Sequence, residues 1–161
     1  MSKLSVLFRA ITYALIFIGL VLIYVPARLL AWTGIVHPTS IGWQQVAGMV
    51  VGAFGAVIAL WCVFTFATTG QGTPAPFDPP RQLVIRGPYR FVRNPMYIGA
   101  GLALGGAALF YQSLPILGYT FLFFLATHLF IVWVEEPTLL RTFGGEYEAY
   151  CRHVGRWRPR L

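Results

Sequence analysis

Charged residues are scarce in this chain. They make up 11% of its 161 residues, whereas a soluble domain of ordinary composition carries about 25%. None lies between Arg9 and Arg28, between Arg28 and Asp78, or between Arg93 and Glu135. Because a run of about 20 apolar residues crosses the hydrocarbon core of a bilayer, the composition excludes an ordinary soluble domain. The gaps predict four membrane-spanning helices, at residues 7–30, 43–66, 97–111 and 115–134.

Cysteine is rarer still, with only two in the chain. Cys62 lies inside a predicted span and Cys151 lies near the end of the sequence. Two cysteines in such different surroundings exclude a disulfide framework and a zinc site of the usual kind. We therefore expect no metal centre.

Acidic side chains number five, against twelve lysines and arginines, which gives a formal net charge of +7. With four spans, both termini and the loop between the second and third spans share one side, and Arg28 is the only basic residue near the other. By the positive-inside rule this side is the cytoplasm, as in a bacterial inner-membrane protein. The asymmetry favours contact with anionic membrane lipids over nucleic acid. The basic residues of this side are Lys3, Arg9, Arg81, Arg86, Arg90, Arg93, Arg141, Arg152, Arg156, Arg158 and Arg160.

The pattern of apolar and polar segments along the sequence indicates one all-α domain over residues 1–161. A cleaved signal peptide would also place Lys3 and Arg9 before an apolar run, but no small-residue cleavage site follows. The glycine pairs Gly48/Gly52 and Gly101/Gly105 have the spacing that lets membrane helices approach closely. Residues 135–161 have helical spacing of apolar and aromatic side chains, which predicts an amphipathic C-terminal helix along the cytoplasmic interface.

Two polar segments stand at the predicted membrane boundary. One is residues 86–99, which contain three arginines, two tyrosines and Asn94, and the other is Glu135-Glu136 at the end of the fourth span. Ionisable groups at such depth are either functional or paired, and pairing of the glutamates with Arg90, Arg93 or Arg141 would be purely structural. If the segments face each other, they suit a ligand with cationic groups, a carboxylate and a flat ring, such as S-adenosylmethionine.

These two segments, GPYRFVRNPMYIG and EEPTLLRTFGGEYEAYCRHVGRWRP, resemble the isoprenylcysteine carboxyl methyltransferase and phospholipid N-methyltransferase superfamily of small membrane enzymes. The resemblance implies an all-helical fold, a cofactor-binding part at about 70–161, and transfer of a methyl group from S-adenosylmethionine to a lipophilic acceptor or lipid. The residues expected to bind the cofactor are Arg81, Gln82, Leu83, Val84, Tyr89, Asn94, Pro95, Met96, Tyr97, Glu135 and Glu136. The candidate catalytic residues are Arg90, Asn94 and His128.

Two positions depart from the superfamily pattern. Asn94 stands where the motif usually has histidine, and Ile131 stands where the prenylcysteine enzymes place an arginine that contacts their substrate. Ile131 offers no partner for the carboxylate of prenylcysteine, and a buried carboxylate without a partner costs several kcal/mol. We therefore do not expect prenylcysteine to be the acceptor. His128 lies one heptad before Glu135 and so on the same side of the helix, where it could act as a general base or bond a neighbouring group. An NADPH-dependent membrane reductase and a non-catalytic membrane protein are the alternatives.

Overall fold

The computed structural model describes residues 15–35, 40–70 and 82–160, together with Phe8, Thr12 and Pro38. Within these residues the protein is all-α, with one isolated bridge between Val92 and Gly155. Three helices are long and apolar enough to cross a membrane: Leu15–Thr33, Trp43–Thr65 and Leu114–Phe143. The remaining apolar helix, α4 (Pro95–Tyr111), has 17 residues and is about 26 Å long, slightly short of a typical hydrocarbon core. The predicted all-α class is confirmed, and the four predicted apolar segments are helical in the part described.

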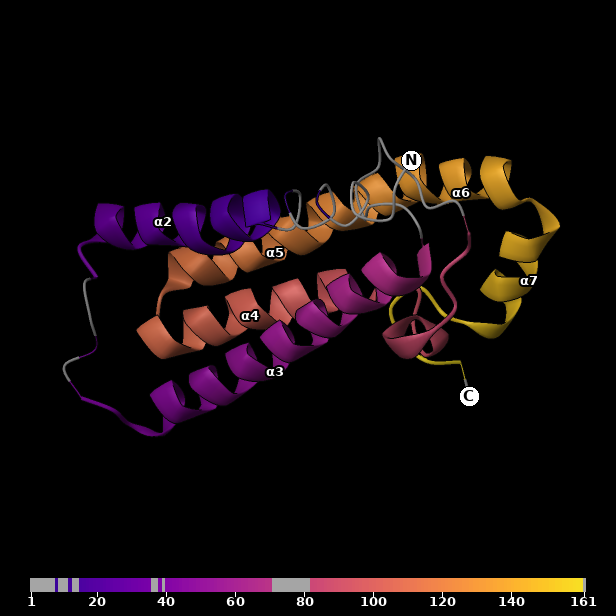
Figure 1. The fold of residues 1–161 in the computed structure, drawn as a ribbon. Helices are drawn as coiled ribbons and strands as arrows, with labels where there is room; N and C mark the ends of the chain where they lie inside the picture. Colours follow the sequence, from indigo (N-terminus) through magenta and orange to yellow (C-terminus); the bar gives the residue numbers. More distant parts are fainter. Residues whose placement is uncertain are drawn as a thin grey trace.

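Helices α3 (Trp43–Thr65) and α4 lie against each other along their lengths (Figure 1). They run antiparallel, so that Gly48 faces Gly106 and Gly55 faces Gly99. A Cβ atom on Gly55 would lie 2.5 Å from the carbonyl oxygen of Gly99, and one on Gly106 would lie 2.5 Å from the backbone nitrogen of Gly52. Real side chains cannot approach a backbone so closely, so this pair of helices depends on glycine.

The predicted glycine pairs are therefore only partly right. Gly48 and Gly52 do both lie at the α3–α4 interface, but a Cβ on Gly101 would meet the Phe124 ring, and one on Gly105 would meet nothing within 4 Å. The interface also contains Gly55 on α3 and Gly99 on α4, each seven residues from Gly48 or Gly106 on its own helix, because two helical turns return a residue to almost the same face.

A second pair of helices covers α4. The π-helical stretch η1 (Ile18–Tyr24) leads into α2 (Val25–Thr33), and both run beside α5 (Leu114–Phe130). The Tyr119 hydroxyl donates to the Val21 carbonyl oxygen at 3.1 Å. Phe123 of α5 packs on the buried Leu104 of α4 and on Phe17. These contacts join the first helix to the rest of the bundle.

The fourth apolar segment does not end at Glu135-Glu136. After α5 the helix widens into the π-helical turn η4 (Ile131–Glu135) and continues as α6 (Glu136–Phe143). Pro137 has no backbone N–H to donate to the preceding turn, and a π turn is one way for a helix to absorb such an interruption. Both glutamates thus lie within a continuous helix, with eight residues of α6 extending past Glu135.

The C-terminal segment is not one helix. Gly144, with a φ of +51°, separates α6 from α7 (Gly145–His153), because a left-handed backbone conformation suits glycine. Helix α7 ends before Val154, and the chain then returns towards the start of α4, where the Arg93 N–H donates to the Gly155 carbonyl oxygen at 2.9 Å. This return brings residues 154–157 to the place where α4 begins and α5 meets α6.

Candidate functional site

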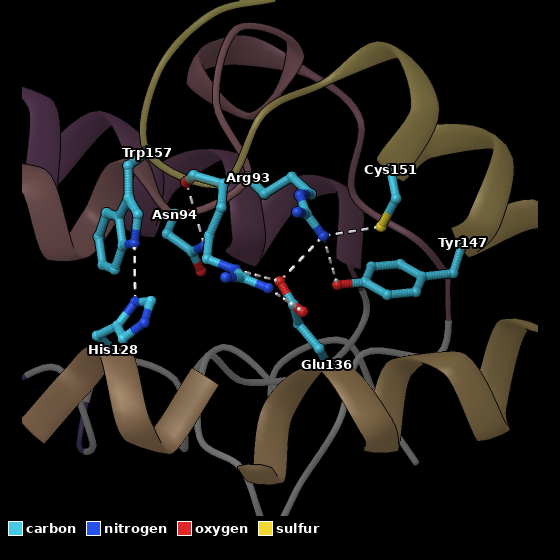
Figure 2. A network of polar contacts seen from close by, with 8 residues as sticks. Arg93, Asn94, His128, Glu136, Tyr147, Cys151 and Trp157 are labelled. Carbon is cyan, nitrogen blue, oxygen red and sulfur yellow. Dashed lines mark hydrogen bonds and ion pairs between the residues drawn. The ribbon is translucent and has the colours of Figure 1, made fainter. Parts of the chain in front are cut away.

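Three segments far apart in the sequence meet at one end of the helix bundle (Figure 2). They are the approach to α4 around Arg93-Asn94, the η4–α6 turn with its two glutamates, and the C-terminal return at residues 154–157. The ligand site suggested by the sequence depended on the meeting of the first two. The sequence did not predict that the third would lie between them.

An ion-pair cluster occupies the centre of this meeting point. The Arg156 guanidinium donates from Nε and Nη2 to the two carboxylate oxygens of Glu136, each at 2.7 Å. Arg93 Nη1 lies 3.0 Å from Glu136 Oε1 and also donates to the Cys151 sulfur and the Tyr147 hydroxyl oxygen, at 2.8 and 3.4 Å. The hydrogen bonds to Glu136 raise the pKa of Arg156, so this arginine stays charged. We call Arg93, Glu136 and Arg156 the Arg–Glu–Arg cluster.

Glu135 has quite different surroundings. Its Oε2 accepts a hydrogen bond from the Tyr97 hydroxyl at 3.3 Å, and no arginine of the described residues pairs with it. The carboxylate is half-buried, and a neutral phenol compensates a buried negative charge less well than a cation does. The two adjacent glutamates thus have different partners. Two arginines pair with Glu136, whereas Glu135 accepts a hydrogen bond from a neutral hydroxyl group that does not compensate its charge.

Asn94 and Tyr150 bind the C-terminal return and α7 to the segment before α4. Asn94, which is 5% exposed, donates from Nδ2 to the Arg156 carbonyl oxygen at 3.3 Å. The Tyr150 hydroxyl donates to the Tyr89 carbonyl oxygen at 2.6 Å. Burial raises the pKa of the Tyr89, Tyr147 and Tyr150 hydroxyls, so all three remain neutral. The described amide contact of Asn94 therefore positions the chain beside the cluster.

His128 lies on α5, seven residues before Glu135, and pairs with Trp157 of the C-terminal return. The Trp157 Nε1–H donates to His128 Nδ1 at 3.1 Å, and the indole also packs edge-on against Phe124. Since Nδ1 accepts a hydrogen bond, the imidazole carries its proton on Nε2 in the neutral form. To take a proton as a general base, His128 would first have to release Trp157.

The other predicted residues lie around this centre at different depths. Val84, Tyr89 and Met96 pack with Cys62 in a core cluster, and Leu83 packs against Tyr147 and Tyr150. Pro95 is buried as the first residue of α4. Gln82 and Arg90 are exposed, and the Arg90 guanidinium lies over the Phe91 ring. Arg81 lies outside the described residues.

Sequence reasoning missed two residues of the site, Arg156 and Trp157. It named Arg90, Arg93 and Arg141 as partners for the glutamates, and the structure confirms Arg93 and adds Arg156. No local pattern identifies Arg156, because its partner is 20 positions away and a glycine-dependent turn lies between them. The sequence signal for Trp157 was its position between two arginines in a polar C-terminal segment.

Exposed tryptophans indicate where the bilayer boundaries lie. Trp43 and Trp61 on α3 are 18 residues apart, which corresponds to about 27 Å along a helix and matches the hydrocarbon thickness. Both are more than half exposed, as are Trp32 at the end of α2 and Trp133 beside Glu135. Tryptophan favours the membrane–water interface, so the exposed Trp133 indicates that the cluster's end of the helices faces one interface. Among the described residues, no group of three His, Cys, Asp or Glu side chains could hold a metal ion.

The fold and the cluster together define an integral membrane protein with a charged site at one end of its helices. The model of the phospholipid methyltransferase family matches residues 43–146, and the chain belongs to this family. Its members are methyltransferases that use S-adenosylmethionine and methylate lipid acceptors. No curated protein and no solved structure matches the chain. The family match favours the methyltransferase prediction over the reductase alternative.

Proposed function

We propose that this protein methylates a lipid acceptor at the cytoplasmic face of the membrane, with the cofactor held beside Glu135. The proposal rests on the difference between the partners of the two glutamates. Glu136 has both oxygens occupied by arginines, whereas Glu135 offers a half-buried carboxylate whose described partner is the neutral Tyr97.

The residues around Glu135 fit S-adenosylmethionine. When bound, it supplies a methyl group on a sulfonium, which the acceptor's lone pair attacks while the carbon–sulfur electron pair stays on sulfur. A carboxylate without a cationic partner matches the ammonium or sulfonium of such a ligand. Tyr97 fixes the orientation of Glu135, and the Tyr89 and Met96 cluster gives this end of the bundle an apolar wall. The chain's own contribution is to orient the reactants and to exclude water, which supplies much of the acceleration of a transfer reaction.

The proposed acceptor reaches the site sideways from the bilayer. Ile131, the first residue of η4, is 1% exposed and uncharged, so an acceptor carboxylate would have no partner at this position. Trp133 and Val134 on the outer side of the same turn are exposed, as expected for a surface that lipid contacts. These features favour a phospholipid over a prenylated cysteine.

A radiolabelled methyl-transfer assay tests this function. Purified protein in detergent should transfer label from S-adenosylmethionine to phosphatidylethanolamine at least about tenfold faster than to farnesylcysteine, because Ile131 replaces the arginine that a carboxylate needs. Glu135→Gln protein, assayed with S-adenosylmethionine well below saturation, serves as the low-activity control. Preferential methylation of the farnesylcysteine carboxylate would refute the proposed acceptor class, and label in neither lipid would refute the function.

Cysteine labelling tests the orientation. In a background lacking Cys62 and Cys151, single cysteines at the exposed positions Arg86 and Glu148 should react with an impermeant maleimide only after cells are permeabilised. A cysteine at the exposed Ser40, between α2 and α3, should react in intact cells. The basic residues concentrated on the first side are the physical reason. Labelling of Glu148→Cys in intact cells would place the site on the outer face.

A further inference from the structure

The Arg–Glu–Arg cluster carries one positive charge in excess, because two guanidinium groups share one carboxylate. The side chains of Arg93, Glu136 and Arg156 are only 12, 20 and 31% exposed. Removing charge from water is costly unless a partner compensates it. The Nε of Arg93 is buried without a hydrogen-bond partner among the described residues, so within this part of the chain the cluster leaves one positive charge and one N–H donor without a partner.

Arg156 is the member of the cluster that can contact a ligand. A guanidinium has five N–H donors, and Glu136 occupies one on Nε and one on Nη2. Its side chain is also the most exposed of the three. Arg93, in contrast, is largely enclosed and directs Nη1 to Glu136, Cys151 and Tyr147.

The depth and the donor geometry favour one kind of anion. Glu136, which joins the two arginines, lies three residues after the exposed Trp133. Trp133 indicates the level of the membrane interface, where the phosphate of a phospholipid lies. The planar fork of arginine matches the oxygens of a phosphate and binds them with two parallel hydrogen bonds. Phospholipids with different headgroups all contain this phosphate. A residue that binds the phosphate therefore holds the headgroup at a constant distance from itself.

We propose that Arg156 binds the phosphate of the phospholipid acceptor, and that Glu136 and Arg93 are positioning residues that hold its guanidinium. This inference rests on the proposed function and adds the substrate group that the enzyme recognises. Glu135, assigned to the cofactor, is not needed for it. The second possible source of an anion is the cofactor's own carboxylate, which the experiment distinguishes.

Binding measured without methyl transfer tests the proposal. Calorimetry would titrate the detergent-solubilised protein with dihexanoylphosphatidylethanolamine below its micelle concentration, and separately with octylamine, glycerol phosphate and S-adenosylhomocysteine. Arg156→Gln should weaken binding of the phospholipid about tenfold and leave octylamine and S-adenosylhomocysteine unchanged. Arg156→Lys, which keeps the charge but loses the fork, should show an intermediate loss. Arg158→Gln, an exposed neighbour in the same segment, should bind like the wild type.

The outcomes separate this proposal from the function on which it rests. Unchanged phospholipid affinity in Arg156→Gln, or absence of phospholipid binding by the wild type, would overturn the inference. Loss of S-adenosylhomocysteine affinity would also overturn it, by assigning Arg156 to the cofactor's carboxylate. Glycerol phosphate binding as tightly as the phospholipid would identify a free-phosphate site and overturn the lipid assignment. Phospholipid binding that depends on Arg156, combined with no methyl transfer by the wild type, would support the site and refute the function.

Discussion

Replacing Glu135 with glutamine should weaken S-adenosylhomocysteine binding about thirtyfold, or about 2 kcal/mol. Glutamine keeps the shape of the side chain and can still accept the Tyr97 hydrogen bond. It lacks the negative charge that would compensate the cationic part of the ligand, and leaving a buried cation without a partner costs free energy. Isothermal calorimetry on the purified protein measures the change.

Glu136→Gln is the matched control, since it makes the same chemical change one residue away. Glu136 joins Arg93 and Arg156, so its loss should lower the free energy of unfolding by about 1–2 kcal/mol, allowing for partial exposure of the pair. Cofactor affinity should change less than in Glu135→Gln. If the two variants lose affinity equally, or only Glu136→Gln does, the assignment of Glu135 is wrong.

Replacing Gly106 with alanine should destabilise the protein by about 2–3 kcal/mol, which is typical of an overpacked interior. The added Cβ would lie 2.5 Å from the backbone nitrogen of Gly52 and 2.6 Å from the carbonyl oxygen of Gly48. Backbone atoms cannot rotate away as a flexible side chain can, so α3 and α4 must separate. Denaturation in mixed micelles measures the loss.

Gly105→Ala, on the neighbouring position of α4, provides the control. Its Cβ would meet nothing within 4 Å, and alanine has a higher helix propensity than glycine by up to about 1 kcal/mol. This variant should be as stable as the wild type or slightly more so. Equal destabilisation by both changes would mean that the helix backbone, rather than the contact between α3 and α4, is sensitive to substitution.

The long uncharged stretches were sufficient to predict the helices. Hydrophobic periods and the absence of charge are local properties, and the bilayer length requirement converts them directly into spans. The ends of helices were less predictable. The fourth apolar helix continues past Glu135 into α6, because a π turn accommodates the proline. The C-terminal segment reverses direction at Gly144, because glycine permits a positive φ.

Residue chemistry alone also identified most of the candidate site. The rarity of acids in this chain drew attention to Glu135 and Glu136, and their position at a membrane boundary suggested either pairing or ligand binding. The structure pairs Glu136 with two arginines and leaves Glu135 beside Tyr97. Adjacent residues on a helix point about 100° apart, so they reach different neighbours.

The sequence by itself determined that this is an all-α membrane protein with a charged site and a methyltransferase motif. Only the tertiary structure decided that Arg156 and Trp157 return to that site and which glutamate remains without a cation. The physical reason is that composition and helical period depend on neighbouring residues, whereas the Arg156–Glu136 and Trp157–His128 contacts join positions 20 and 29 residues apart. Such contacts depend on the direction in which the chain leaves Gly144 and on how closely glycine lets α3 and α4 approach.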